Sequence, residues 1–325
     1  TQTVITYIAG FVYQKIVPAG GNAATVPDTL QYVLHEEGRI RYTISSTTWA
    51  YDYFLKDHLG NIRSVVTGEQ RTDAYPPASL ETAAINNEKL YYSGLDNGIV
   101  NKNTVSGYPS NDTYTNPNDF IQKLSGATNI TGAGILLKVM AGDKLNVHAG
   151  SWYKLNGATP DQPVSPLPGL ITALLNGVPG ISGNKILASQ LNSGILNPSL
   201  TGFLNTRDAT GNSSRPAAWL NIIVLDEQLN PVITSDGKNS YYEQVGPGNT
   251  SSVKQYTISG REITKNGYVY IYVSNETPNV NVYWDNLQVT HVRGALLQEE
   301  GYYPFGLEMK ALCSQAATVT TNNYK

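Results

Sequence analysis

Apolar and polar residues alternate over short stretches in the first 70 residues, and polar turns separate these stretches. Segments 30–42 (LQYVLHEEGRIRY) and 51–66 (YDYFLKDHLGNIRSVV) each hold a run of β-forming residues, a polar turn with a glycine, and a shorter run that begins Ile-Arg. This pattern is typical of a β-hairpin. Segment 4–13 (VITYIAGFVY) predicts a strand pair or one bent strand, with Gly10 as a bulge or kink.

The two hairpin segments form an internal repeat with an offset of 22 residues. The residues that recur at this offset are Gly38 and Gly60, Ile40 and Ile62, and Arg41 and Arg63. A repeat of this length predicts stacked hairpins, each of which buries one face against the next. The alternative is a chance pair of similar hairpins.

The segment 88–293 carries short strand patterns at close spacing, with clear alternation in YVYIYV at 268–273. Many short strands that are separated by turn residues favour a β-sandwich. The expected strands are 134–140, 144–155, 218–226, 241–245, 254–258, 267–274 and 281–292.

One part of this segment, 167–205, has a helical pattern, with Leu170, Ile171, Leu174 and Leu175 on one face. Two further short helices are expected near 184–192 and 198–205. We expect the helices to cap one end of the sandwich. The alternative is an apolar contact with a membrane or a partner.

The C-terminal segment 294–325 has the same tyrosine-rich hairpin pattern as residues 1–70, because tyrosines precede a Pro-Phe-Gly turn in EEGYYPFGL at 299–307. The polar stretch 71–87 is interpreted as a linker. We therefore predict an all-β chain in which tyrosine-rich hairpins at 1–70 and 294–325 frame an inserted sandwich at 88–293, with one to three short helices.

The composition agrees with this fold class and limits the classes of partner that the chain can bind. The chain has 325 residues with 22 Tyr against 5 Phe, and only 14% of its residues are charged, against about 25% in an average protein. A net charge of −3 without a basic stripe argues against nucleic-acid binding. No apolar run is long enough to span a membrane. The low-charge surface predicts an extracellular or cell-surface location, and the start at Thr1 without Met predicts a processed or excised piece.

The segments 51–66 and 302–307 (YYPFGL) resemble the RHS/YD-repeat proteins of Bacteroidota, whose tyrosine-rich hairpins carry a D-H-L-G-N-x-R motif. Segments 5–13 and 34–41 fit the same family. The resemblance implies repeats that coil into a β-shell, which encloses a C-terminal toxin or presents an adhesive surface. Only two or three repeat units are present here, too few to close a shell, so neither a complete cage nor self-cleavage is expected.

The segments 136–157 and 267–291 resemble the inserted sandwich of these proteins and the jelly-roll of carbohydrate-binding modules. This likeness implies a jelly-roll fold, glycan binding, and an Asp of the last strand that helps to bind a structural Ca²⁺. Asp285 has that position, and Asp143 and Asp96 are the further candidate ligands for a cation that takes six to eight oxygens. The alternative is that Asp285 bonds only to neighbouring loop amides. No other cofactor is expected.

Aromatic side chains of the sandwich are candidates for a sugar-stacking platform, because aromatic faces suit the apolar faces of sugars. The candidates are Trp152, Tyr153, Trp219 and Trp284. Tyr283 and Trp284 face opposite sides of one strand, so only one of them points into the core. The alternative for each candidate is an ordinary core position.

No group of residues with a catalytic pattern is visible, and we predict no catalytic residue and no enzymatic activity. The lone Cys313 lies in a polar tail, and Asp57 beside His58 is expected to cap a turn. The histidines lie in four separate segments without a metal-binding motif, at His35, His58, His148 and His291.

Three function hypotheses follow. The first is a non-enzymatic, extracellular structural or adhesive RHS-like protein whose sandwich binds cell-surface glycans. The alternative is a subunit of an extracellular fibre, in which terminal strands of one chain pair with the next copy. The expected assembly residues are Tyr7, Phe11, Tyr13, Tyr302 and Tyr303. The third is a carrier-shell fragment of a polymorphic-toxin protein.

Overall fold

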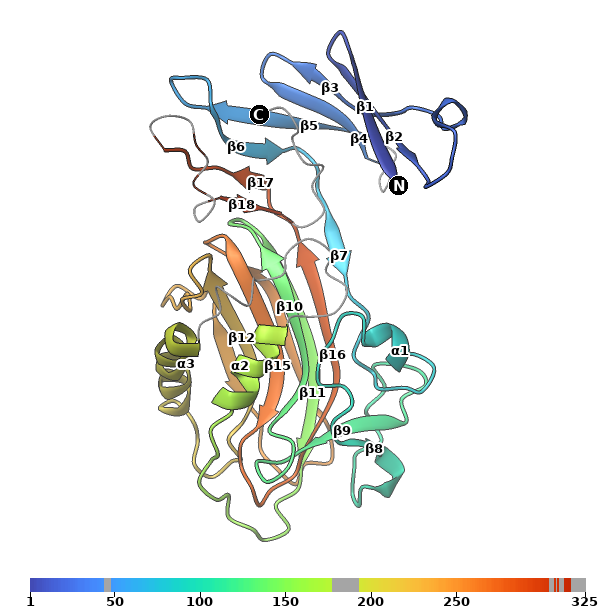
Figure 1. Ribbon diagram of the computed structural model, residues 1–325. Coiled ribbons are helices and arrows are strands. Elements are labelled where there is room, and N and C mark those ends of the chain that lie inside the picture. The colour runs from blue at the N-terminus through green and yellow to red at the C-terminus, as the bar shows by residue number, and fades with distance from the viewer. Residues whose placement is uncertain (44–47, 177–192, 304–306, 308, 310–312, 317–325) are drawn as a thin grey trace. The chain divides into compact units, whose positions relative to one another are not determined.

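The computed structural model describes residues 1–43, 48–176, 193–303, 307, 309 and 313–316 (Figure 1). Within them the chain divides into two compact units, which we call the hairpin unit (1–71 and 294–316) and the sandwich unit (72–293). Both units consist mainly of antiparallel β-sheet, which confirms the predicted β-rich fold class. The Pro-Phe-Gly turn at 304–306 and the helix expected at 184–192 lie outside the described residues.

The hairpin unit is one eight-stranded antiparallel sheet in which the strands follow one another in chain order. The strands are β1 (Gln2–Ile8), β2 (Phe11–Val17), β3 (Thr29–His35), β4 (Gly38–Thr43), β5 (Thr48–Lys56), β6 (Ile62–Thr67), β17 (Leu296–Glu299) and β18 (Ser314–Gln315), with a short 3-10 helix at Ala23–Thr25. The predicted hairpins at 30–42 and 51–66 are confirmed. They are not stacked, however, because β4 also pairs with β5 and joins the hairpins edge to edge.

Three glycines of this sheet have different roles. Gly10 (φ +89°) and Ala9 (φ +47°) form a two-residue turn between β1 and β2, so segment 4–13 is a strand pair and Gly10 is not a bulge. Gly60 (φ +87°) lies in the turn after β5. Gly38 instead allows a close approach, because a Cβ there would lie 2.0 Å from the carbonyl oxygen of Asp52. Gly38 and Gly60 are therefore not structural equivalents, although they keep the offset of the repeat.

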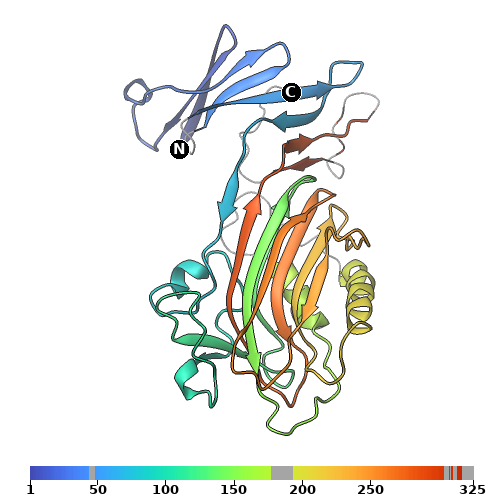
Figure 2. The same cartoon turned by 180° about the vertical axis from the view of Figure 1, so that it is seen from behind.

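The sandwich unit contains two further antiparallel sheets (Figures 1 and 2). One has the order β10 (Thr131–Val139), β15 (Gly267–Asn275), β12 (Ala218–Asp226) and β13 (Tyr241–Gln244). The other has the order β14 (Lys254–Glu262), β11 (Lys144–Tyr153), β16 (Val282–Val292), β9 (Phe120–Leu124) and β8 (Ile99–Asn101), and β7 (Thr72–Ala74) also pairs with β16. All seven strands expected between 134 and 292 are present.

The two sheets of the sandwich unit share one hydrophobic core. Both contribute side chains that are at most 2% exposed, including Leu137, Leu145, Ile222, Ile271 and Val289. Burial of such an aliphatic side chain contributes about 1.5–3 kcal/mol to folding. The core is therefore the main source of stability in this unit.

Helices cover the outer face of the sheet β10-β15-β12-β13 (Figure 1). The helices of the described chain are α1 (Ile85–Glu88), α2 (Leu167–Asn176) and α3 (Ser193–Asp208), with a 3-10 helix at Lys102–Thr104. Leu170 and Leu174 of α2 and Phe203 of α3 pack against the outward side chains of the sheet, such as Tyr272. Helices α2 and α3 thus cover a sheet face rather than capping an end. None of them is long and apolar enough to cross a membrane.

Candidate functional site

A cavity of about 250 Å³ opens on the sandwich unit, between loop 160–163, the C-terminal end of α3 and the start of β12. We call it the Trp219 pocket. Its lining combines this indole with polar side chains, which include Asp161, Gln162, Asp208, Asn212, Arg215 and Gln244. A second cavity of about 200 Å³ shares Pro163 and Asp208 with it and reaches Glu276.

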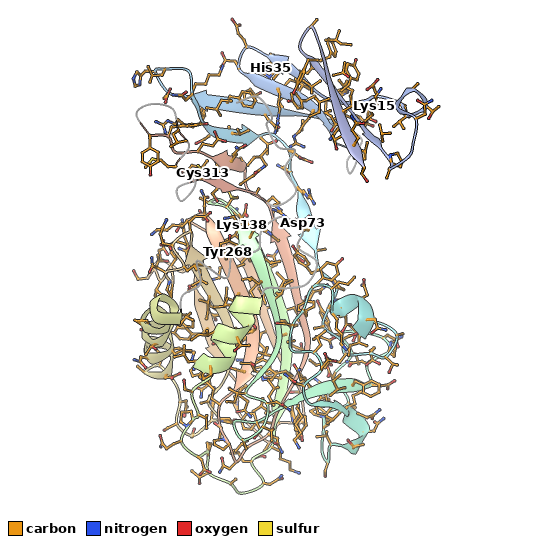
Figure 3. The ribbon with its side chains drawn as sticks, viewed as in Figure 1. Lys15, His35, Asp73, Lys138, Tyr268 and Cys313 are labelled. Atoms are coloured by element: carbon orange, nitrogen blue, oxygen red, sulfur yellow. The ribbon has the colours of Figure 1, made fainter. Side chains whose placement is uncertain are left out.

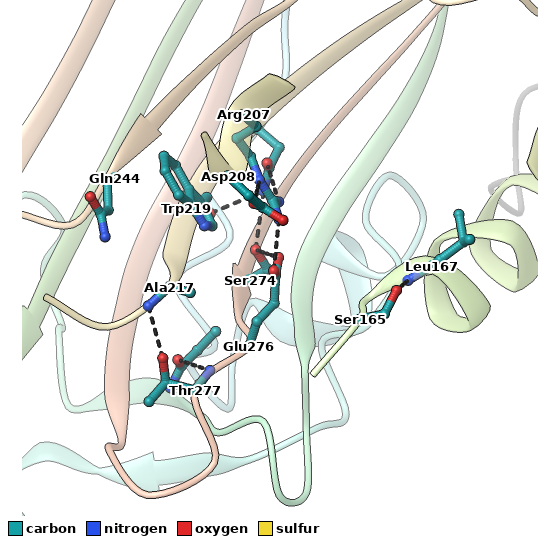
Figure 4. Close-up of polar contacts among 12 residues, drawn as sticks. Ser165, Leu167, Arg207, Asp208, Ala217, Trp219, Gln244, Ser274, Glu276 and Thr277 are labelled. Carbon is teal, nitrogen blue, oxygen red and sulfur yellow. Dashed lines mark hydrogen bonds and ion pairs between the residues drawn. The ribbon is translucent and has the colours of Figure 1, made fainter. Parts of the chain in front are cut away.

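The wall of the pocket is fixed by Gln244 of β13, which lies directly opposite Trp219 in the sheet (Figure 4). The Gln244 amide donates to the carbonyl oxygens of Asn212 and Pro216 at 3.1 and 3.0 Å, and its oxygen accepts from the Asn212 N–H at 2.7 Å. One side chain therefore holds both ends of the loop 212–216.

Two lining residues, Asp208 and Trp219, are held by Arg207, which is fully buried at the end of α3 (Figure 4). Its guanidinium donates to Asp208 at 2.8 Å, to Asn221 at 3.1 Å and to Glu276 at 2.7 Å. The same group lies 5.0 Å from the centre of the Trp219 ring. Arg207 therefore joins the helix to β12 and to the end of β15, and it holds the indole in place.

Trp219 brings an unused hydrogen-bond donor to this site. The residue is 3% exposed, and its Nε1 has no hydrogen-bond partner in the described part of the structure. A buried N–H without a partner carries a free-energy cost of about 1–3 kcal/mol.

Glu276 is the titratable group that the environment alters most clearly at this site. Burial raises its pKa to about 7, although the charge of Arg207 lowers it, and the nearby Asp208 carboxylate raises it further. The Glu276 carboxylate is 1% exposed and is bonded to Arg207. These contacts are typical of a structural ion pair that responds to pH, and less so of a nucleophile.

The other predicted glycan-binding residues lie in the interior. Trp152, Tyr153 and Trp284 are only 3%, 2% and 2% exposed, and the last two belong to the sandwich core. The Trp152 Nε1 donates to the carbonyl oxygen of Thr250 at 2.9 Å. The four candidates therefore form no open platform, and among them Trp219 is the one that lines a described cavity.

The three candidate calcium ligands do not come together. Asp143 bonds to His291 Nε2 at 2.7 Å, Asp96 forms an ion pair with Lys89, and Asp285 lies against Asp112. Burial and the Asp112 carboxyl raise the pKa of Asp285 well above its usual value. Asp285 and Asp112 supply at most four of the six to eight oxygens that calcium takes, and the described residues contain no group of three or more acidic, His or Cys side chains that could hold a metal ion.

In the hairpin unit, Asp57 bonds to three other residues of the D-H-L-G-N-x-R motif. Its carboxylate accepts from the backbone N–H groups of Leu59 and Asn61 at 2.9 and 3.0 Å, from the Asn61 amide, and from Arg63 at 3.0 Å. Desolvation opposes ionisation, but these bonds and the Arg63 charge outweigh it and lower the pKa of Asp57 to about 2. The prediction that Asp57 caps the turn is confirmed.

The residues predicted for assembly are spread over the hairpin unit. Tyr7, Phe11 and Tyr303 are 48%, 41% and 50% exposed, whereas Tyr13 and Tyr302 are half-buried. Phe11 lies on the opposite face of the sheet from Tyr7, because Tyr7 pairs with Val12. These residues therefore form no single patch.

Sequence reasoning found Trp219 but missed Arg207, Asp208, Gln244 and Glu276. The stretch 207–216 (RDATGNSSRP) carries the available signal, because a polar, turn-rich segment with two Arg precedes a tryptophan at the start of a strand. Comparison with family models, curated proteins and solved structures finds no match to this chain.

Proposed function

We propose that this chain is a non-enzymatic, extracellular adhesive protein of the RHS type, whose sandwich unit binds a saccharide in the Trp219 pocket. The Asp57 turn and the tyrosine-rich hairpins support the RHS part of the proposal. The observation that carries the binding part is the cavity itself, which joins an indole to several polar side chains.

We also propose that the sandwich unit is a jelly-roll. Its eight strands from β9 to β16 form two sheets, ordered β10-β15-β12-β13 and β14-β11-β16-β9. Consecutive strands alternate between the sheets at every step except β12 to β13. Two four-stranded sheets connected by such long crossings support a jelly-roll, a fold that also occurs in lectins.

A saccharide suits the pocket for chemical reasons. Sugar hydroxyls donate and accept at once, and they match a lining of carboxylate, amide, guanidinium and indole groups. A cavity of about 250 Å³ suits one ring of a glycan rather than a long chain. Trp219 Nε1 is the donor that still needs an acceptor.

The test is a glycan array followed by calorimetry on two matched variants. Trp219→Phe keeps an aromatic ring but loses the free N–H, so affinity should fall about 5- to 10-fold, the worth of one hydrogen bond. Trp152→Phe is the control, because this equally buried indole lies outside the pocket and already bonds to Thr250. If no glycan binds, or if both variants bind like wild type, the binding proposal fails.

A fibre subunit is the second candidate, and β1 favours it. This edge strand pairs only with β2 in the described structure, and its sequence QTVITYI holds no charge and no proline. Such an unprotected edge is a template for strand addition. Negative-stain microscopy of wild type and Ile5→Pro, which removes an N–H that points away from β2, decides. Fibres that vanish in the variant support this candidate, whereas dispersed wild-type particles at high concentration exclude it.

A further inference from the structure

The sheet of the hairpin unit has an exposed face formed by apolar and aromatic side chains. Residues directly opposite each other in an antiparallel sheet share a face, and the register places Ile8, Phe11, Val33, Ile40 and Tyr51 in one row across five strands. Neighbouring positions extend this row on the same side. We call the whole set the aromatic face: Ile8, Phe11, Val33, His35, Ile40, Tyr42, Trp49, Tyr51, Tyr53, Leu55 and Val66.

The opposite face of the same sheet is buried and charged. Arg39 and Asp52 are 1% and 0% exposed, and they form an ion pair at 2.8 Å. Arg41 donates to the same Asp52 oxygen at 2.8 Å and to Glu69 at 2.5 Å. Trp49, Tyr51 and Tyr53 on the aromatic face are 51%, 49% and 45% exposed. Val12, Tyr32, Ala50 and Val65 are buried on the same side as the charged cluster, so apolar residues lie on both faces of this sheet.

The rings of the aromatic face already contact one another. Tyr42 lies edge-on to Trp49 with ring centres 5.3 Å apart, and His35, labelled in Figure 3, lies 6.4 Å from both Tyr51 and Tyr53. The register also places Lys15 on the side of Phe11 and Glu299 on the side of Leu55, so charge is found at two ends of the face and not among these rings. Rings that hold each other in place lose little side-chain freedom when a partner covers them.

We propose that the aromatic face packs against the same face of a second copy of this chain. A monomer rarely exposes an apolar patch of this size. An aromatic side chain covers roughly 150–250 Å², so each half-exposed one leaves roughly 100 Å². The most exposed members are Ile8, Phe11, Tyr42, Trp49, Tyr51, Tyr53 and Leu55. Together they offer roughly 700 Å², close to the roughly 800 Å² that each partner contributes to a standard interface.

A second copy fits this surface better than a charged partner does. The aromatic centre of the face has no charge that would need a complement, and its ends carry one basic group (Lys15) and one acidic group (Glu299), so the face can be complementary to itself under a two-fold axis. Two sheets then pack face to face, as in the core of a β-sandwich. This contact joins sheet faces and is distinct from strand pairing at β1.

Two isoleucines provide a matched pair of variants. Ile8 and Ile16 are 57% and 58% exposed on the adjacent strands β1 and β2, but the alternation places Ile16 on the face opposite Ile8. Lysine at Ile8 would bury a charge within the contact, whereas lysine at Ile16 would stay in water. Tyr51→Lys makes the same change at the other end of the row, between the exposed Trp49 and Tyr53.

The experiment is sedimentation velocity of the full chain over a range of micromolar concentrations, with thermal melting as a folding check. We expect a wild-type dimer whose dissociation constant rises at least about tenfold in Tyr51→Lys, the size typical of an aromatic interface residue. Ile8→Lys should weaken the dimer as well, and Ile16→Lys should leave it unchanged. If Tyr51→Lys fails to fold, the isoleucine pair decides.

Trp49 provides a second readout. It is 51% exposed, whereas the other three tryptophans of the chain are 2–3% exposed, so acrylamide quenching reports mainly on Trp49. Quenching should decrease as the dimer forms. A wild type that stays monomeric with Trp49 fully quenchable overturns the proposal. An assembly that Ile8→Lys and Tyr51→Lys leave unchanged overturns it equally.

Discussion

The two units are both antiparallel β-structures, but they place their large aromatic and aliphatic side chains differently. In the sandwich unit, two sheets enclose Leu, Ile and Val side chains. In the hairpin unit, a single sheet buries the Arg39–Asp52–Arg41 cluster and exposes its aromatic face. Alternation fixes which residues share a side of a strand, but it does not fix which side faces water. That choice depends on what covers the sheet.

The largest expected effect comes from the charged cluster of the hairpin unit. Asp52→Asn leaves Arg39 and Arg41 beside each other without their shared carboxylate, and a broken buried ion pair costs about 3–5 kcal/mol. Chemical denaturation followed by Trp49 fluorescence measures it. Asp28→Asn is the control, because Asp28 is 42% exposed in its ion pair with Lys15, and a surface pair contributes at most about 1 kcal/mol. Equal effects of the two variants would contradict the contrast between the units.

The sandwich core should respond to the loss of apolar volume instead. Ile271 is 0% exposed in β15, and Ile271→Ala should lower the free energy of unfolding by about 2–5 kcal/mol. Ile233 is 50% exposed in the same unit, and Ile233→Ala should change it by no more than about 0.5 kcal/mol. Denaturation followed by circular dichroism measures both. A small effect at Ile271 would show that the core of the sandwich is not its main support.

Glu276 predicts a pH dependence that belongs to the sandwich unit. Its folded-state pKa of about 7 lies above the ordinary value of 4.5, so the folded chain binds more protons between these values. Stability contributed by this group is therefore present below about pH 4.5 and is lost as pH rises to about 7, by up to about 3 kcal/mol. Asp285 acts in the same direction.

Melting curves between pH 4 and 8 test this prediction. Glu276→Gln should flatten the profile, while Glu262→Gln should leave it as in wild type, because Glu262 is 40% exposed. A wild-type profile that rises over this range would contradict the assignment.

The smallest expected effect contrasts two glycines. Gly60→Ala forces a Cβ onto a left-handed residue (φ +87°) and should cost about 1 kcal/mol. Gly202 lies in the exposed interior of α3 with open space around it, so Gly202→Ala should stabilise by about 0.5–1 kcal/mol. Opposite shifts of the melting temperature are the expected result. Shifts of the same sign would contradict the role of Gly60 in the turn.

The pattern of apolar and polar residues was sufficient to predict most of the long strands and one turn. Long alternating runs such as 267–274 predicted their strands, and the local chemistry of Asp57 predicted its cap. The strands β8 and β9 were missed, because three and five residues are too short for periodicity to register. The linker predicted at 71–87 contains β7 and α1, which the structure places in the sandwich unit.

The candidate site was less accessible from the sequence. Trp152, Trp219 and Trp284 all lie on strands, and only their tertiary neighbours distinguish core from pocket. Arg207 and Glu276 are 69 residues apart in the chain, so no local sequence pattern predicts their ion pair. The exposure of the aromatic face was not predictable either, because the alternation of side chains in β5 is the same whichever side of the sheet is covered.

The pairing of β7 with the end of β16 has a consequence for how the sandwich unit is connected to the hairpin unit along the chain. Thr72 lies opposite Val292, so the sandwich unit begins and ends at neighbouring positions. In the hairpin unit, β6 and β17 pair with each other on either side of this insertion. Excising the sandwich would leave two strands that a short turn can reconnect. Removal of the sandwich unit should therefore leave the pairing register of β6 and β17 unchanged.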